Sequence, residues 1–401
     1  MEITGDEIRR RMIDHESLDP GGLRLVGATI TGQLDLSDVV AKRPLVLRDC
    51  TAEQPVVLDR AQFTVLDLSG LVAPSLRARG LAVDHHLRLS GARLSADESV
   101  DALHMRIGGS VYLDEGFHAS GSVTLSGSQI AAVLMCAGAR FEAGLFLVDL
   151  RVGDGIFLSQ GCEVSGGGRH ASVRLRGTRV DGQLVLRGGR FSSPGVALDM
   201  RHVRVGKELF MPFGSVEGKA QLEGLTYEGL PRDATVDEWL AFLPTRTLRY
   251  SAAPWAQLAA AHQAAGHERD VRRIRVAQQR DLRRRGRLSR WGRAWHLVRG
   301  VTVGHGYRPG LALVWLAGVL VVSVTVVLSS GAVRCSVVEQ VGYALNVATP
   351  LVKVDAARCT VDGASLTGQA VLASTWLLQL LAWAFATLFV AGFTGLVRRN
   401  A

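Results

Sequence analysis

The chain has few cysteines for its 401 residues, and none of them is arranged as a typical metal or redox site. The five are Cys50, Cys136, Cys162, Cys335 and Cys359. No two have CxxC spacing, which argues against a zinc ribbon and against a thioredoxin-type site. Five cysteines in a chain of this length are also too few to hold the fold together by disulfides.

The motifs of common enzyme classes are absent as well. The sequence has no GxxxxGK[ST] phosphate loop, no HExxH zinc motif and no GxSxG nucleophile motif. The segment VGDGIFL contains Gly153 and Gly155, but Leu158 stands where a dinucleotide-binding loop needs a third glycine. We therefore expect no catalytic residue, no cofactor site and no metal site, and we favour a binding protein over an enzyme.

Histidines do not form an evident site either. His85 and His86 adjoin an expected strand, where alternation places one ring inside and the other outside. His104 and His118 fall on different turns of the repeat described below. We expect structural roles for these side chains.

The N-terminal segment MEITGDEIRRRMIDHESL has no apolar run after its basic residues, so a secretory signal is not expected. Ile3, Ile8, Met12 and Ile13 can instead form the apolar stripe of a short helix. Residues 1–20 are predicted to form a helix that caps the following domain.

A short phrase recurs throughout residues 21–229, for example GSVTLSGSQI at 121 and GQLVLRGGRF at 182. Most copies follow one another at short and nearly regular intervals, with longer gaps at 95–101 and 165–170 that predict loops. The alternating apolar residues predict short strands with one buried face, and the small residue after each strand permits a tight corner. Strands this short must stack to bury their faces, with Leu184 and Leu186 pointing into one core.

Two such units make a coil of about 22 residues, which predicts a right-handed parallel β-helix of about seven or eight coils. The pattern resembles the pentapeptide-repeat solenoids, in which the central residue is Leu or Phe and the corner residue is small. An antiparallel sandwich or barrel is the alternative, and the absence of Asn-Gly hairpin turns disfavours it. The 22 basic and 22 acidic residues of 21–229 leave no charge excess with which to imitate DNA.

Residues 230–300 are predicted to form a basic helical neck. VDEWLAFL has helical spacing, a second helix begins near Pro254 and ends at Gly266, and a third covers 268–285. The last two resemble a single tetratricopeptide-type hairpin, which we expect to pack against the last coil.

Two long runs of apolar residues follow, at 309–328 and 371–397. The first has 20 residues without a charge, enough to cross the roughly 30 Å core of a bilayer. Residues 269–308 hold 13 arginines against two aspartates, and Arg398 and Arg399 follow the second run. By the positive-inside rule both termini are cytoplasmic, in a cell-membrane protein that crosses the bilayer twice. The loop at 329–370 then lies outside, where Cys335 and Cys359 are expected to form a disulfide.

The basic block before the first run is expected to contact anionic lipid headgroups. The arginines expected to face the lipid are Arg283, Arg284, Arg285, Arg287, Arg290 and Arg293. Few aromatic residues are interleaved with them, which argues against binding to nucleic acid.

The loop at 329–370 is predicted to contain an amphipathic helix. Its apolar stripe would consist of Val337, Val341, Leu345 and Ala348. A span, a short helix and a second span resemble the pore unit of two-helix ion channels. However, TPLVKV stands where a potassium filter carries Thr-Val-Gly-Tyr-Gly, so a helix resting on the outer leaflet is favoured.

The whole layout, including PWAQLA at 254 and the final GLVRR, resembles a bacterial family of membrane-anchored, pentapeptide-repeat-like solenoid proteins. Members are sometimes labelled membrane-associated oxidoreductases. The favoured function is a cytoplasmic solenoid that binds or scaffolds an unknown protein partner and is tethered to the bilayer. The alternatives are a channel regulated by its solenoid and, on the family label alone, an oxidoreductase. The partner and the oligomeric state are left open.

Overall fold

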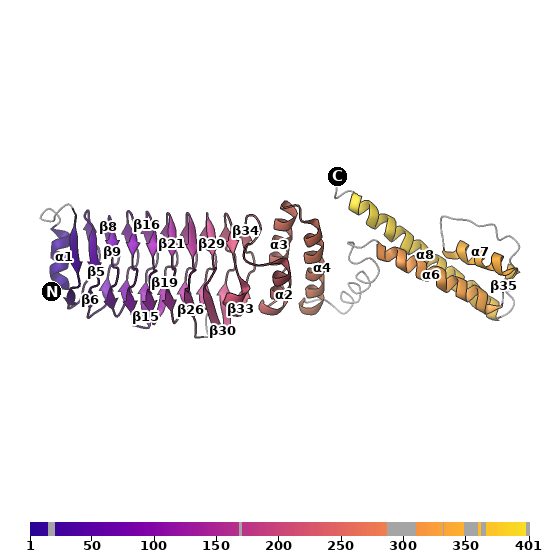
Figure 1. Cartoon of the computed structure of the whole chain (residues 1–401), viewed down its shortest axis with the longest axis horizontal. Coiled ribbons are helices and arrows are strands. Elements are labelled where there is room, and N and C mark those ends of the chain that lie inside the picture. Colours follow the sequence, from indigo (N-terminus) through magenta and orange to yellow (C-terminus); the bar gives the residue numbers. More distant parts are fainter. Residues whose placement is uncertain are drawn as a thin grey trace. The chain divides into compact units, whose positions relative to one another are not determined.

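The computed structural model describes residues 1–14, 21–167, 171–286, 310–331, 333–348, 360–361 and 366–397. The chain divides into two compact units, Met1–Arg275 and Val276–Ala401. The first unit is a parallel β-solenoid of nine turns followed by helices, as the repeat predicts (Figure 1). The second unit is built mainly from helices.

Each complete turn of the solenoid has four sides, numbered here in the order in which the chain passes through them. Side 1 holds β2 (Leu23–Val26), β5 (Leu45–Arg48), β9 (Leu66–Asp67), β13 (Leu87–Arg88), β17 (Val111–Tyr112), β21 (Val133–Met135), β25 (Gly155–Phe157), β29 (Gln183–Val185) and β32 (Leu209–Phe210). Side 2 holds β1 (Glu2–Thr4), β3 (Thr29–Thr31), β6 (Thr51–Ala52), β10 (Val72–Ala73), β14 (Arg93–Leu94), β18 (His118–Ala119), β22 (Arg140–Phe141), β26 (Glu163–Ser165) and the start of β30 (Arg190–Asp199). Side 3 holds β7 (Val56–Val57), β11 (Leu76–Arg77), β15 (Glu98–Asp101), β19 (Ser122–Thr124), β23 (Leu145–Phe146), β27 (Val173–Arg174) and the end of β30, with which β33 (Val216–Gln221) also pairs. Side 4 holds β4 (Val40–Ala41), β8 (Gln62–Phe63), β12 (Ala82–Val83), β16 (Arg106–Ile107), β20 (Gln129–Ile130), β24 (Arg151–Val152), β28 (Arg179–Val180), β31 (Arg204–Val205) and β34 (Thr226–Tyr227).

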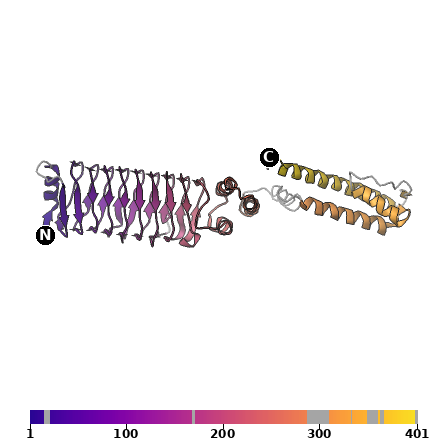
Figure 2. The same ribbon diagram turned by 45° about the horizontal axis from the view of Figure 1, so that its top comes forward.

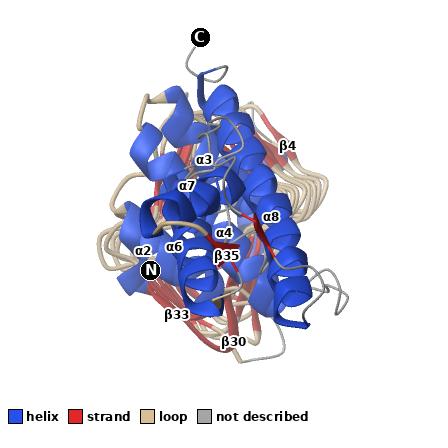
Figure 3. Cartoon of the chain, turned by 90° about the vertical axis from the view of Figure 1, so that its right-hand side faces the viewer, coloured by secondary structure: helices blue, strands red, loops and turns tan. Residues whose placement is uncertain are grey.

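Equivalent residues of successive turns stack on one another. Leu45 pairs with Leu66 and Leu66 with Leu87, so these regular turns are equal in length. Strands of neighbouring turns lie side by side (Figure 2), and their loops superpose when the solenoid is viewed along its length (Figure 3). Leu184 and Leu186 are both fully buried, which confirms the predicted inward face. Full burial of one such leucine stabilises a fold by roughly 1.5–3 kcal/mol.

The corners need left-handed backbone. Gly70 has φ of +68°, and in the preceding turn Asp49 adopts φ of +51°. Glycine reaches this region without steric cost, while Asp and Asn tolerate it better than most residues. The small or polar residue that follows each repeated phrase therefore forms the corner.

Two details of the repeat differ from the prediction. The nine turns exceed the expected seven or eight, because the first and last turns lack the regular phrase and could not be recognised from the sequence. The longer gaps do correspond to extra residues between sides 2 and 3. However, Glu98 to Asp101 form β15, with a register shift between Glu98 and Val100, so the first loop is shorter than expected.

Helices cover both ends of the solenoid. At the start, α1 (Gly5–Ile13) buries Ile8 and Met12, whereas Ile13 is 54% exposed. At the other end lie α2 (Val236–Arg246), α3 (Ala252–Ala264) and α4 (Glu268–Arg285), whose bounds agree with the predicted neck helices. The Gln257 side chain donates a 2.7 Å hydrogen bond to the carbonyl oxygen of Tyr227, so α3 contacts the last turn, as expected for the hairpin. Because both ends are covered, their strand edges are not open to pairing with other chains.

The second unit contains α6 (Gly310–Ser330), α7 (Val337–Ala348) and α8 (Leu366–Val397), together with the short strands β35 (Val333–Arg334) and β36 (Thr360–Val361). Two of its helices are long and apolar enough to cross a membrane, over Leu313–Ser330 and Leu366–Val390. The helix α8 begins at Leu366, ahead of the predicted Val371. Polar residues at a helix end do not break the helix, so the apolar run alone marks only the part of α8 that is apolar enough to cross a membrane.

The helix α7 lies where an amphipathic helix is predicted, but only part of the predicted stripe is buried. Ala348 of the stripe is fully buried and Val337 is 66% exposed, while Ala344 and Val347, outside the stripe, are also buried against α6 and α8. Apolar residues occur on most sides of this helix, so spacing did not single out one face. Small residues such as Ala344 let the helices approach closely, which the apolar count does not capture.

Candidate functional site: an arginine-lined side of the solenoid

Side 4 presents a row of arginine side chains to solvent. In each of its two-residue strands the second residue points inward, so Ile107, Val152 and Val180 are at most 3% exposed. The first residue then points outward. In successive strands these outward residues are Arg106, Gln129, Arg151, Arg179 and Arg204, and their pairing is in register.

We call Arg106, Arg151, Arg179 and Arg204 the arginine ladder. Neighbouring parallel strands lie about 4.8 Å apart, so Arg151, Arg179 and Arg204 begin one above another at this spacing. Guanidinium groups are charged at all accessible pH values, and like charges directly opposite one another on a sheet destabilise it. The ladder therefore places repulsive charges together.

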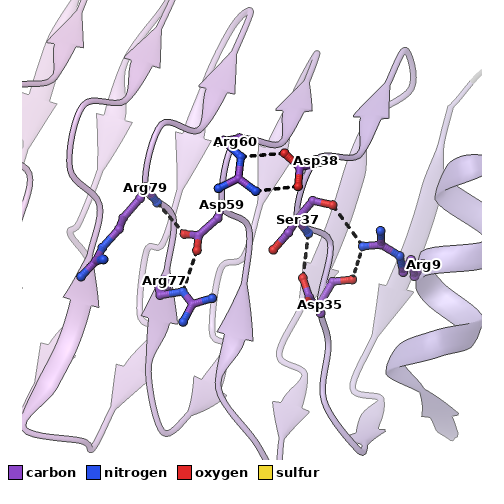
Figure 4. Close-up of polar contacts among 8 residues, drawn as sticks. All are labelled: Arg9, Asp35, Ser37, Asp38, Asp59, Arg60, Arg77 and Arg79. Atoms are coloured by element: carbon purple, nitrogen blue, oxygen red, sulfur yellow. Dashed lines mark hydrogen bonds and ion pairs between the residues drawn. The ribbon is translucent and has the colours of Figure 1, made fainter.

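Many arginines on the other sides have acidic partners. On sides 1 to 3 and at their corners, eight arginines pair with acidic groups: Arg48, Arg60, Arg77, Arg79, Arg140, Arg187, Arg190 and Arg201. Figure 4 shows the first turns, where Arg60 binds Asp38 and Arg77 binds Asp59. Within the described ranges, no carboxylate forms an ion pair with the ladder's guanidinium groups. The charge balance of the solenoid as a whole thus conceals an unbalanced row on side 4.

A shallow hollow runs along the same side. It is lined by the outward side chains of β12, β16, β20, β24 and β28 and by small residues beside them, including Gly108, Ala131 and Gly153. A Cβ atom at Gly153 would lie 2.0 Å from the carbonyl oxygen of Ala131, so only glycine permits this close stacking. Asp84 and Asp181 also border the hollow and offset part of its charge.

The predicted basic cluster is only partly within the described residues. Arg283, Arg284 and Arg285 lie on α4, and two Arg285 nitrogens bind the buried Asp281 at 2.6 and 2.7 Å. Arg287, Arg290 and Arg293 lie outside the described residues. Contact of this cluster with lipid headgroups stays a prediction.

The cysteines fall into two groups. Cys50, Cys136 and Cys162 are free thiols with no exposed surface. Burial raises the pKa of all three, for Cys162 to about 12, which disfavours the reactive thiolate. Cys335 is disulfide-bonded, and Cys359, its predicted partner, lies outside the described residues. Arg334 pairs with Thr360 in β35 and β36, next in sequence to each of these two cysteines, which supports the predicted bond.

The histidines of the solenoid have structural contacts. His86 is half-buried and its Nδ1 accepts a 3.0 Å hydrogen bond from the backbone N–H of Ser110. His85 is exposed, so neither ring enters the core. His118 Nε2 lies 2.9 Å from an oxygen of Glu142 in the next turn.

The sequence reasoning missed the arginine ladder. Its signal is the recurring phrase Arg, then Val or Ile, then Gly or Asp, at 106, 151, 179 and 204. These copies align on one side only when the unequal lengths of the turns are known. No family model, no curated protein and no solved structure matches the chain.

Proposed function

We propose that this protein is a membrane-tethered scaffold whose solenoid binds an acidic segment of a partner protein along the arginine ladder. The observation that carries this proposal is the in-register row of guanidinium groups, which have no acidic partner among the described residues. An acidic segment would relieve their repulsion and gain charge-assisted hydrogen bonds. Solenoids also provide the extended, rigid surfaces that suit such binding.

The chemistry of side 4 favours a polypeptide over a nucleic acid. Its outward residues in the described strands include no aromatic side chain on which bases could stack. Asp84 and Asp181 would repel a continuous phosphate backbone, whereas a polypeptide can place neutral residues beside them.

The tether consists of α6 and α8. Val314, Val321 and Leu380 on these helices are between 64% and 69% exposed, which suits contact with lipid tails. We place the solenoid and both chain ends in the cytoplasm, in keeping with the basic residues that precede α6. Protease cleavage of tags at the two ends from outside intact cells would contradict this orientation. The layout supports kinship with the membrane-anchored, pentapeptide-repeat-like solenoid proteins.

The binding test uses the full chain in detergent and fluorescently labelled poly-L-glutamate. We expect Arg151→Glu with Arg179→Glu to weaken binding about tenfold or more, which corresponds to about 1.4 kcal/mol. The matched control is Arg24→Glu with Arg93→Glu, an equal charge change on sides 1 and 2. Wild-type binding should also fall as salt is raised from about 50 to about 300 mM, the range over which exposed charges become screened.

An equal loss in both double variants would mean that only net charge matters, and would contradict the proposed site. Single-stranded DNA or vesicles containing phosphatidylserine serve as competitors. If either displaced poly-L-glutamate more effectively than unlabelled poly-L-glutamate does, the acidic polypeptide would be the wrong partner class.

A further inference from the structure

The turn between α3 and α4 brings together His262, His267 and Asp270. One potential ligand atom from each lies within 4.8 Å of the others, and the two histidine Nδ1 atoms are 3.4 Å apart. The chain reverses here at Gly266, which has φ of +75°. Glycine therefore sets the tight turn that brings both rings to the same place.

Backbone hydrogen bonds fix the three residues. The N–H of His267 donates to the carbonyl oxygen of His262 at 2.9 Å, and the N–H of Asp270 donates to that of His267 at 3.0 Å. The backbone that carries the three side chains is thus held without contacts between the rings. A rigid turn of this kind holds potential ligands in place before a metal binds.

The distance between the rings suits a shared metal ion better than a direct hydrogen bond. N–H donors normally lie about 2.9–3.0 Å from their acceptors, which is shorter than the observed separation. Two nitrogens bound about 2.0–2.1 Å from a tetrahedral ion lie about 3.4 Å apart. The 3.4 Å between the two histidine Nδ1 atoms matches this separation.

The chemistry and charge of the groups also suit a cation. His262 is 6% exposed, and imidazole is the commonest metal ligand among protein side chains. Asp270 supplies an anionic oxygen, although one of its oxygens also lies 3.1 Å from Arg273. Arg273 also binds Asp237 on α2, so its positive charge is divided between two carboxylates.

We propose that His262, His267 and Asp270 bind one zinc-like divalent transition-metal ion, with water in the fourth position. Two imidazoles and one carboxylate favour such an ion over Ca²⁺ or Mg²⁺, which prefer oxygen ligands. The bound ion joins the end of α3 to the start of α4. It therefore stiffens the neck hairpin, which lies next to the last turn of the solenoid.

The test is zinc binding by the tag-free full chain in detergent, after removal of metal with a chelator. We expect one equivalent of Zn²⁺ to bind, in competition with a chromophoric indicator, and the thermal midpoint to rise. His267→Ala and Asp270→Asn, both at residues outside the core, should each weaken binding at least about tenfold and reduce the thermal shift. His267→Cys replaces one zinc ligand by another and should restore binding.

The matched control is His85→Ala, which removes an exposed histidine of the solenoid and should bind Zn²⁺ like the wild type. Circular dichroism of each metal-free variant checks that the fold is retained. Zinc binding of wild-type strength in His267→Ala and Asp270→Asn would overturn the proposal. So would the absence of a tight equivalent in the wild type, because the indicator detects binding whether or not the midpoint moves.

Discussion

Three cysteine thiols line the interior of the solenoid without contact with water. Cys136 and Cys162 have raised pKa values because desolvation disfavours the thiolate, and the same holds for Cys50. A thiol reacts with disulfide reagents as the thiolate and only when the reagent can reach it. These residues therefore act as small apolar side chains of the core.

We predict that none of these three thiols reacts with an aromatic disulfide reagent at pH 8 while the protein is folded. All three should react once the chain is denatured. The free energy of unfolding should also decrease as pH rises above the pKa of an unfolded thiol. The folded-state pKa of Cys162, about 12, exceeds the unfolded value, so its contribution is complete below about pH 8.5 and is lost as pH rises toward 12. Rapid reaction of a thiol in the folded chain would show that the core is open at that position.

The strand is the element for which sequence reasoning worked best. Alternating apolar residues around Leu184 and Leu186 identified strand, buried face and stacking, because a period of two has one structural meaning. The buried face of α7 was harder to predict from the sequence, because alanines and valines occur on most sides of that helix. The arginine ladder on side 4 was harder still to predict. The step between stacked residues is longer from Ile156 to Leu184 than from Leu66 to Leu87, so distance along the sequence does not align the ladder.

The hairpin of α3 and α4 illustrates a different limit. Its helices and its turn at Gly266 follow from the sequence. The approach of His262 to His267 does not, because residues five apart in a regular helix lie on different faces. Only the left-handed turn between them brings the rings together.

A charge in the core should break the stacking of strands. We predict that Leu186→Asp lowers the free energy of unfolding by more than about 4 kcal/mol, since it buries a carboxylate without a partner. Urea denaturation of the full chain in detergent, followed by circular dichroism, measures this. Val185→Asp is the control, because Val185, the last residue of β29 and the neighbour of Leu186, points outward, and its substitution should cost little. Equal stability of Leu186→Asp and wild type would mean that the inward face is wrongly assigned.

The two units carry different chemistry, and the proposed scaffold needs only a connection between them. Unit 1 holds the arginine ladder, the histidine turn and nine stacked turns of β-structure. Unit 2 holds two apolar helices with α7 packed against both. If the spans serve as an anchor, they matter through length and apolarity, and the binding surface lies wholly in the other unit.

The anchor and the channel make opposite demands on the spans. Replacing Leu313–Ser330 and Leu366–Val390 by unrelated apolar helices of equal length should leave poly-L-glutamate binding unchanged if they only anchor the solenoid. A pore instead needs specific packing, such as that of Ala344 and Val347 of α7 against α6 and α8.

We predict that purified wild-type protein in planar bilayers carries no ion-selective current. The segment TPLVKV lacks the glycines with which backbone carbonyls form a filter, and residues 329–370 have no net charge to attract ions. Current steps that are present in the wild type and lost in the span-swapped chain would establish a pore and contradict the anchor. Silence at all voltages, together with intact binding after the swap, is the result that a tether requires.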